Sequence, residues 1–374
     1  MDRFRFRAQV VGMDIDRGAI KAVQLSKVGG SYTLQHVGYH RLAPGAIEDG
    51  EVADHDLLTS EIQEFWSTHS FKGKSVSLGL ANQGIVVRLL DFPRMSPEDL
   101  KSAIGYEAQD HIPMPLEEAV MDYVSLGPKE EDSDLDRILI VAAQREMVGR
   151  YTSAIRAAGL RPVGIDVKAL SLVRATLPED FFDEGDILLL DIGSELSNLV
   201  VCQHGNPMFT RFIPGGSTYF ARMVAGAAGL PEEDAEDVLT RSKVMLENPE
   251  DLESSQGGGG EDDETDPSLD RTFRRNVRRG IEDAAQTLVE DVQRCIEYHY
   301  SQPGAREVSQ VLVSGEGALV AGLESYLGEL LQLPTSRGNP LQKLAANKSN
   351  VSEEQLEVME PVLAVALGLA LEDS

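Results

Sequence analysis

The segment Val10-Val11-Gly12-Met13-Asp14-Ile15-Asp16 is an apolar run that ends in acidic residues. A polar turn follows, then a second run over Ile20–Leu25, a Gly29-Gly30 turn and a third run over Tyr32–Gly38. Short runs separated by turn residues are typical of strands, and so apolar a first strand is typical of one buried on both faces. The segment predicts a three-stranded meander with Asp14 at the end of its buried strand.

A second copy of this pattern begins at Ile187-Leu188-Leu189-Leu190-Asp191-Ile192-Gly193. A run over Leu199–Cys202 and another over Met208–Ile213 follow, with turns between them. Asp191 holds the place that Asp14 holds in the first copy, and about half of the 374 residues separate the two. The duplication predicts two similar α/β domains that face each other.

The two aspartates suggest a site for a metal and a phosphate. A carboxylate at the end of a buried strand, beside a turn with free N–H groups, can hold Mg²⁺ through water while the turn binds phosphates. Lys21, on the returning strand, could reach a phosphate as a point charge. The alternative is that Asp14 and Asp191 only start turns, as aspartate often does. That alternative suits either turn alone, but two matched copies favour the ligand site.

A glycine-rich turn occurs a third time, in Ser314-Gly315-Glu316-Gly317-Ala318, after the apolar run Val308–Val313. A helix is expected after it, with Leu319, Leu323, Leu327 and Leu330 on one face. Such a turn lets a ligand approach the backbone closely. A dinucleotide-binding loop is disfavoured, because the glycine spacing is wrong and no acid follows about 20 residues later.

These turns, in this order, resemble those of the actin/Hsp70/sugar-kinase superfamily of ATP-binding folds. Within it, the chain resembles the PilM family of type IV pilus assembly. The most specific stretch runs from Leu90-Asp91-Phe92-Pro93-Arg94-Met95-Ser96-Pro97 to Met121-Asp122-Tyr123 and matches the family signature nearly residue by residue. In its own right, this stretch predicts a helix capped by Ser96, begun by Pro97 and ended before Pro113. The resemblance extends from about Val10 to Leu371, apart from residues 248–270.

The resemblance implies an α/β fold of the actin-like ATPase type, with two facing ribonuclease-H-like domains and an inserted SHS2-type subdomain. Residues 1–83 and 165–186 would form the first domain, residues 84–164 the inserted module, and residues 187–374 the second domain. Residues 248–270 contain nine acids, no Lys or Arg and four consecutive glycines. Because such a segment buries little apolar surface, it predicts a disordered acidic loop.

The implied function is a cytoplasmic scaffold that binds nucleotide in the cleft and the tail of a PilN-like inner-membrane protein on the module. ATP and Mg²⁺ are the implied cofactors, and the pilus motor ATPase and self-association are further expected interactions. The expected nucleotide-binding residues are Asp14, Arg17, Lys21, Asp191, Gly193, Ser194, Asn198, Gly215, Gly216, Gly315, Glu316 and Gly317, with Asp14 and Asp191 at the metal. The expected partner-binding residues are Tyr106, Ile112, Pro113 and Met114. For the last four, packing within the module's own core is the alternative.

Three departures from the family pattern point to weakened chemistry. The first turn reads Asp14-Ile15-Asp16-Arg17-Gly18 where the family commonly has Asp-Ile-Gly-Ser-Ser. Lys168 stands where the family commonly has an acid, and an ammonium cannot accept a proton from water. Glu316 replaces a glycine of the late turn. We therefore expect ATP binding rather than efficient ATP hydrolysis, and no catalytic residue can be assigned.

Two other functions remain as alternatives. One is an enzyme of the same fold, an ATPase or a small-molecule kinase, although the cleft turns supply no candidate base beyond the two aspartates. The other is an FtsA-like filament protein, which shares the inserted module. The chain shows no membrane-targeting amphipathic helix at its C-terminus, which disfavours that alternative.

Composition agrees with a cytoplasmic protein at the inner face of the cytoplasmic membrane, held there through partners. The net charge of −28 opposes binding to nucleic acid. No apolar run is long enough to predict a bilayer-spanning helix or a signal peptide. The two cysteines, Cys202 and Cys295, lie in no metal or redox spacing and are expected in the core.

Overall fold

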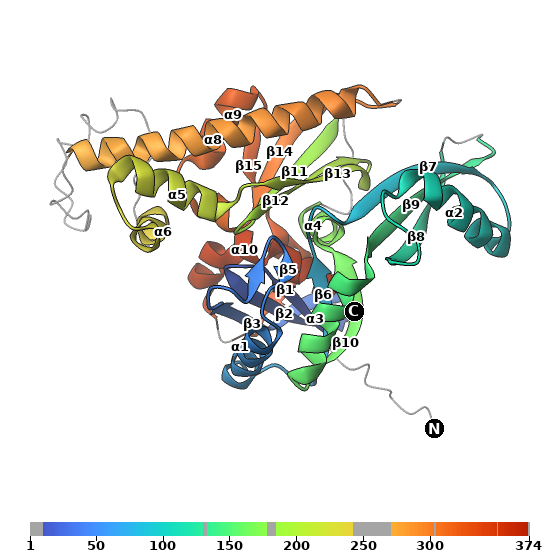
Figure 1. Ribbon diagram of the computed structural model, residues 1–374, viewed down its shortest axis with the longest axis horizontal. Helices are drawn as coiled ribbons and strands as arrows, with labels where there is room; N and C mark the ends of the chain where they lie inside the picture. The colour runs from blue at the N-terminus through green and yellow to red at the C-terminus, as the bar shows by residue number, and fades with distance from the viewer. Residues whose placement is uncertain are drawn as a thin grey trace.

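The computed structural model describes residues 10–129, 133–177, 185–241, 271–302, 304–349 and 351–372. Two sheets, each flanked by helices, form two halves, and a smaller module projects to one side (Figure 1). Residues of both halves line a cavity between the sheets, here called the cleft. The acidic segment 248–270, expected as a disordered loop, lies outside the described residues.

The first sheet contains both the first predicted meander and the end of the chain. Its order among the described strands is β10 (Arg161–Val167), β6 (Ser75–Leu80), β1 (Val11–Ile15), β2 (Ala19–Val28), β3 (Ser31–Arg41) and β16 (Leu344–Asn347). Strands β1, β2 and β3 pair antiparallel, as the sequence predicts, while β6 and β10 pair parallel. Every residue of β1 is buried, in agreement with its apolar sequence.

The second sheet repeats this topology. Its order is β13 (Asn206–Pro214), β12 (Leu196–Gln203), β11 (Asp186–Ile192), β14 (Val308–Ser314) and β15 (Thr335–Arg337). The second meander, β11, β12 and β13, is antiparallel, and β14 and β15 follow in parallel. The predicted duplication is therefore present, and the carboxyl ends of β1 and β11 both lie at the cleft.

Helices cover the faces of the sheets. The first sheet packs with α1 (His55–Thr68), α3 (Arg145–Ala157), α4 (Lys168–Thr176) and α10 (Glu353–Glu372). The second half contains α5 (Ser217–Ala228), α6 (Glu232–Arg241), the long α8 (Arg271–Tyr300) and α9 (Leu323–Leu331). The expected helix after the third glycine turn is divided into a 3₁₀ turn at Glu316–Leu319 and α9.

The last helix returns to the first half of the molecule, although the sequence assigns residues 187–374 to one domain. Helix α10 packs on β1, β2 and α4, and β16 extends the first sheet beside β3. Two glycines make this approach possible. A Cβ on Gly12 would lie 2.1 Å from the carbonyl oxygen of Ala366, and one on Gly368 would lie 1.9 Å from that of Ser171. Residues 344–347 and 353–372 thus belong structurally with the first sheet.

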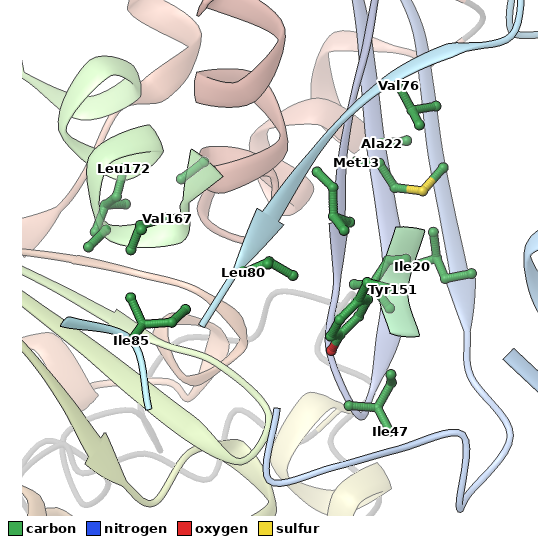
Figure 2. Close-up of a cluster of buried hydrophobic side chains, with 14 of the residues drawn as sticks. Met13, Ile20, Ala22, Ile47, Val76, Leu80, Ile85, Tyr151, Val167 and Leu172 are labelled. Atoms are coloured by element: carbon green, nitrogen blue, oxygen red, sulfur yellow. The ribbon is translucent and has the colours of Figure 1, made fainter. Parts of the chain in front are cut away.

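A large apolar core joins the first sheet to its helices. Figure 2 shows Met13, Ile20 and Ala22 on β1 and β2 among side chains from neighbouring strands, with the ring of Tyr151 from α3 near Ile20. Leu172 of α4 and Val167 of β10 belong to the same cluster. The second half has its own core, which includes Cys295, while Cys202 lies in the first cluster. Both cysteines are buried and unpaired, as expected.

The projecting module has a separate small core. It consists of a sheet in the order β7 (Val86–Pro93), β9 (Leu135–Gln144) and β8 (Ala119–Pro128), covered by α2 (Pro97–His111). As the sequence predicts, Ser96 caps α2, and its hydroxyl accepts a hydrogen bond from the N–H of Asp99. The module was expected to continue to residue 164, but α3 packs on α1, and β10 pairs with β6 of the first sheet.

The remaining elements are short. A two-stranded ribbon, β4 (Ile47–Glu48) and β5 (Glu51–Val52), contributes Gly50 of its turn to the lining of the cleft, and a second 3₁₀ turn spans Pro340–Lys343. None of the helices within the described ranges is both long and apolar enough to cross a membrane.

Candidate functional site

The two aspartate turns lie at equivalent positions of their sheets and line one cavity. In the first meander Asp14 is paired in register with Lys21, and in the second Asp191 is paired with Asn198. Residues of both turns line the same cavity between the sheets. The duplicated sequence pattern thus brings its two acids to opposite walls of one cleft.

Lys21 is buried among three carboxylates. Its Nζ lies 2.6 Å from Asp16 Oδ2, 3.3 Å from Glu316 Oε1 and 3.6 Å from Asp14 Oδ2. Burial acts to lower the pKa of Lys21, but the charges of Asp16, Glu316 and Asp14 outweigh it and hold that pKa well above its ordinary value. The lysine therefore stays charged and is fully engaged within the chain.

Asp16 folds back over its own turn. Its Oδ1 accepts hydrogen bonds from the N–H groups of Gly18, at 2.9 Å, and Ala19, at 3.0 Å, while Oδ2 faces Lys21. Burial acts to raise the pKa of Asp16, yet the charges of Lys21 and Lys168 lower it below its ordinary value. The Asp16 carboxylate thus occupies the N–H donors of Gly18 and Ala19 in the first turn.

Lys168, at the start of α4, reaches the same turn from the other side. Its Nζ lies 2.6 Å from Asp14 Oδ1 and donates a hydrogen bond of 2.9 Å to the carbonyl oxygen of Ile15. The side chain is 8% exposed, so this ion pair is shielded from water. Both oxygens of Asp14 consequently face ammonium groups.

The second turn is held by neutral partners instead. Asp191 accepts a hydrogen bond of 2.9 Å from Asn198 Nδ2 and a longer one from the hydroxyl of Ser314. Burial, followed by the charge of Asp14, raises the pKa of Asp191 above its ordinary value. The Oδ1 atom of Asn198 is buried and has no hydrogen-bond partner among the described residues. This side of the cavity therefore offers an unused acceptor.

Several contacts cross the cleft between the two halves. Glu316 joins Lys21 to Ser217, whose hydroxyl donates to Glu316 Oε2 at 3.1 Å. Arg17 pairs with Glu195 at 3.2 Å, and Glu195 also accepts a hydrogen bond from the N–H of Asp49. Burial raises the pKa of Glu316, although Lys21 opposes the shift, and burial also raises that of Glu195. Ion pairs between charged side chains thus connect the two halves across the cleft.

The cavity left between these side chains has a volume of about 30 Å³. That is room for a few water molecules, whereas pockets for drug-sized ligands occupy about 300–1,000 Å³. A divalent cation at Asp14 would have to replace Lys168, and a phosphate on the first turn would have to replace Asp16. The residues as arranged therefore do not fit Mg²⁺ with ATP at the first turn.

A second, larger hollow lies on the projecting module. It has a volume of about 450 Å³ and runs between the edge strand β7 and helix α2. Its apolar lining comes from Leu90, Phe92, Met95, Ala103 and Tyr106. Tyr106 is 74% exposed, which is unusual for a large aromatic side chain. We call this hollow the β7–α2 groove.

A family model of type IV pilus assembly protein PilM matches residues 12–255 and 270–374, nearly the whole chain. The chain belongs to the PilM family. A solved PilM–PilN type IV pilus biogenesis complex is similar over 98% of this chain and 99% of the matched chain, at 25% identity and a TM-score of 0.79.

More distant solved structures share the fold. The ethanolamine utilization protein EutJ from Carboxydothermus hydrogenoformans is similar over 97% of this PilM-family chain and 89% of the EutJ chain, at 14% identity and a TM-score of 0.52. The structure of MreB5 of Spiroplasma citri bound to ADP is similar over 98% of this chain and 96% of the MreB5 chain, at 11% identity and a TM-score of 0.53. The predicted actin-like fold is confirmed for this PilM-family chain.

Most of the residues expected at the nucleotide lie around the small cavity. Its lining includes Asp14, Arg17, Lys21, Asp191, Gly193, Ser194, Asn198 and Gly315. Glu316 contacts Lys21 at its edge. Gly216 lies against the carbonyl oxygens of Gly193 and Ser194, where a Cβ would come within 2.5 Å of both, and Gly215 precedes it at a positive φ of 110°. Gly317 packs on Ile192 instead.

The four residues expected at the partner are divided by the structure. Tyr106 lines the β7–α2 groove. Ile112 is buried in the core of the module, and Met114 packs against that core from a half-buried position. Pro113 between them is exposed. Ile112 and Met114 therefore pack in the core of the module, which is the alternative considered for them from the sequence.

Sequence reasoning missed several residues of both sites. Glu195 pairs with Arg17 across the cleft, and Ser217 holds Glu316 from within the second half, but an isolated acid or serine gives no sequence signal for a distant partner. In the groove, Leu90, Phe92 and Met95 belong to the signature stretch that was recognised, yet its apolar residues could not be divided between core and groove. The signal that could have helped is the alternation of side chains along a strand, which places residues such as Leu90 and Phe92 on one face of the sheet.

Proposed function

We propose that this PilM-family chain is a scaffold of type IV pilus assembly that binds an extended segment of a PilN-like inner-membrane protein in the β7–α2 groove. The observation that carries the proposal is the groove itself, an apolar hollow beside an unpaired strand edge with an exposed aromatic side chain. The similar PilM–PilN complex supports the identity of the partner.

The groove suits an extended peptide for two physical reasons. Strand β7 pairs with β9 along one side only among the described strands, so its other side can add a strand through main-chain hydrogen bonds. Leu90, Phe92 and Tyr106 can receive alternate side chains of that strand.

Charge favours a partner segment that carries basic residues. The chain has a net charge of −28, and Asp91 and Glu107 lie at the groove. Asp91 is already paired with Lys129 at 2.8 Å, whereas Glu107 has a longer contact of 3.9 Å with His111 and is the more available acid. Complementary charge speeds association more than it strengthens the final complex. Docking on such a tail would hold the chain at the cytoplasmic face of the inner membrane, where we also place its contacts with the motor ATPase.

Nucleotide in the cleft is the second ligand to consider, because MreB5, which shares the fold, binds ADP and AMPPNP. In this chain a nucleotide phosphate can reach the first turn only in exchange for the Asp16 carboxylate. We therefore place partner docking first and nucleotide binding second, and we assign no hydrolytic step.

The docking proposal can be tested with a labelled peptide from the cytoplasmic N-terminus of a PilN-like inner-membrane protein. Fluorescence anisotropy should show saturable binding to the wild type and at least about tenfold weaker binding to Tyr106→Ala, a loss of about 1.4 kcal/mol. Tyr298→Ala is the matched control, since Tyr298 is 51% exposed on α8. A peptide N-methylated on alternate amides should also lose affinity, because it cannot pair with a strand edge.

Two results would contradict the docking proposal. One is binding of equal strength by the wild type and the folded Tyr106→Ala variant. The other is the same loss of affinity in Tyr298→Ala, which would point to a general effect of removing a tyrosine. Circular dichroism melting curves establish that each variant is folded.

A further inference from the structure

The contacts of Asp16 are those that a bound phosphate would make at the same turn. A phosphate on a turn accepts hydrogen bonds from successive backbone N–H groups and attracts a nearby lysine. Asp16 Oδ1 accepts from the N–H groups of Gly18 and Ala19, and Oδ2 lies 2.6 Å from Lys21 Nζ. The donors that would receive a phosphate are therefore taken by a carboxylate tethered two residues away.

The contacts of Lys168 are those of a cation bound at the end of β1. Its ammonium lies between Asp14 Oδ1 and the carbonyl oxygen of Ile15, both oxygen ligands of the type that Mg²⁺ prefers. The lysine is buried and enters from α4, so it is held in place by the packing of that helix. A positive charge thus already neutralises Asp14 without a metal.

The side chains that fill the cleft also connect its two walls. Lys21 on β2 contacts Glu316 beyond β14, and Arg17 contacts Glu195 in the turn before β12. In addition, the N–H of Gly315 donates to the carbonyl oxygen of Pro361 in α10 at 2.9 Å. These contacts close the cleft between the sheets with groups that belong to the chain.

We infer that Asp16 and Lys168 are internal substitutes for the phosphate and the cation of a nucleotide site, so that this chain closes its cleft with its own side chains. The inference is independent of the β7–α2 groove and concerns a different part of the fold. A nucleotide would have to compete with Asp16 for the same donors while its phosphates met the carboxylates of Asp14 and Glu316. Like charges at about 4 Å repel strongly even at an effective dielectric constant near 20.

The phosphate half of the inference is tested by removing the tethered carboxylate. In Asp16→Gly the N–H groups of Gly18 and Ala19 lose their acceptor, and Lys21 loses the nearest of its three carboxylates. Calorimetric titration with ADP and Mg²⁺ should give at least about tenfold tighter binding to this variant than to the wild type. Glu64→Gln is the matched control, since it removes one exposed acid on α1 and should bind like the wild type.

Asp16→Ser serves if the glycine variant does not fold, because serine also removes the charge. The inference is overturned if the wild type binds ADP as tightly as the folded Asp16 variants, or if Glu64→Gln gains the same affinity. The second result would mean that net charge, rather than the position of Asp16, limits binding.

The cation half is tested separately with Mg²⁺ alone. Lys168→Ala leaves a space beside Asp14 Oδ1 and the carbonyl oxygen of Ile15. Millimolar Mg²⁺ should raise the melting temperature of this variant by a few degrees and leave the wild type unchanged. If Lys168→Ala unfolds, Lys168→Met keeps most of the volume and permits the same comparison. An equal response to Mg²⁺ in wild type and variants would overturn the assignment of Lys168.

Discussion

Lys21 Nζ and Glu316 Oε1 lie 3.3 Å apart although the two residues belong to opposite halves of the molecule. Lys21 is on β2 of the first sheet, and Glu316 follows β14 of the second. Because the lysine also contacts Asp16, one buried ammonium connects the first turn to the opposite wall. This pair is therefore one of the contacts that hold the two walls of the cleft together.

Neutralising Glu316 should therefore weaken the fold more than neutralising Glu195. Glu316→Gln removes a buried charged partner of Lys21 and should cost about 1–3 kcal/mol in the free energy of unfolding. Glu195→Gln removes an ion pair whose side chains are 34% and 24% exposed, and should cost less than about 1 kcal/mol. Urea denaturation measures both. Equal losses would show that Lys21 and Glu316 do not hold the two halves together.

The approach of α10 to β1 depends on the absence of a side chain at Gly12. Gly12→Ala would place a Cβ 2.1 Å from Ala366 O and 2.5 Å from Ala370 N, both backbone atoms that cannot turn away. We expect a loss of about 3 kcal/mol or more in the free energy of unfolding. Gly149→Ala, within α3, is the control.

A Cβ on Gly149 meets no atom within 4 Å, so that variant should gain about 0.5–1 kcal/mol from helix propensity. Thermal melts of the two variants decide the matter. A Gly12→Ala variant as stable as the wild type would place α10 further from β1 than in this structure.

The raised pKa of Asp191 predicts a pH dependence of defined sign. Burial and the charge of Asp14 raise it above the ordinary value of 3.8, so the folded chain keeps this proton at a pH where the unfolded chain has lost it. Wild-type stability should therefore fall, through this group, as the pH rises from about 3.8 through the folded-state pKa. The Asp191→Asn variant has no carboxyl group at this position, so its stability does not fall with pH through this group.

The free energy of unfolding of Asp191→Asn, relative to the wild type, should consequently increase between about pH 4 and pH 7. Urea denaturation at several pH values gives the difference. A relative stability that stays constant or decreases over that range would show that Asp191 is not held in the environment described.

Much of the fold could be predicted because the deciding signals are local. The apolar runs ending in Asp14 and Asp191 predicted two meanders, and both are present. Ser96 followed by Pro97 predicted the start of α2. In each case the residues that form the element are neighbours in sequence, so their periodicity and capping chemistry suffice.

The rest depends on contacts between distant segments. The sequence placed the C-terminal helix in the second domain, because chain order does not reveal that Gly12 and Gly368 allow it to pack on β1 and α4. It expected Lys21 to reach a phosphate; one of its partners, Glu316, lies almost three hundred residues away, and the contact with Asp16 depends on how the turn folds. Asp16 and Lys168 were seen as departures from a pattern, but only the structure brings them to Asp14 and its turn.

The most direct test of the proposed docking function is amide hydrogen exchange of the whole chain with and without the PilN-like N-terminal peptide. We expect slower exchange in β7 and in α2 around Tyr106, because a strand added to the edge of β7 would protect its outward N–H groups. The turns at Asp14 and Asp191 should exchange as before. Protection at those turns with none in β7 or α2, or no change anywhere at saturating peptide, would contradict docking in the β7–α2 groove.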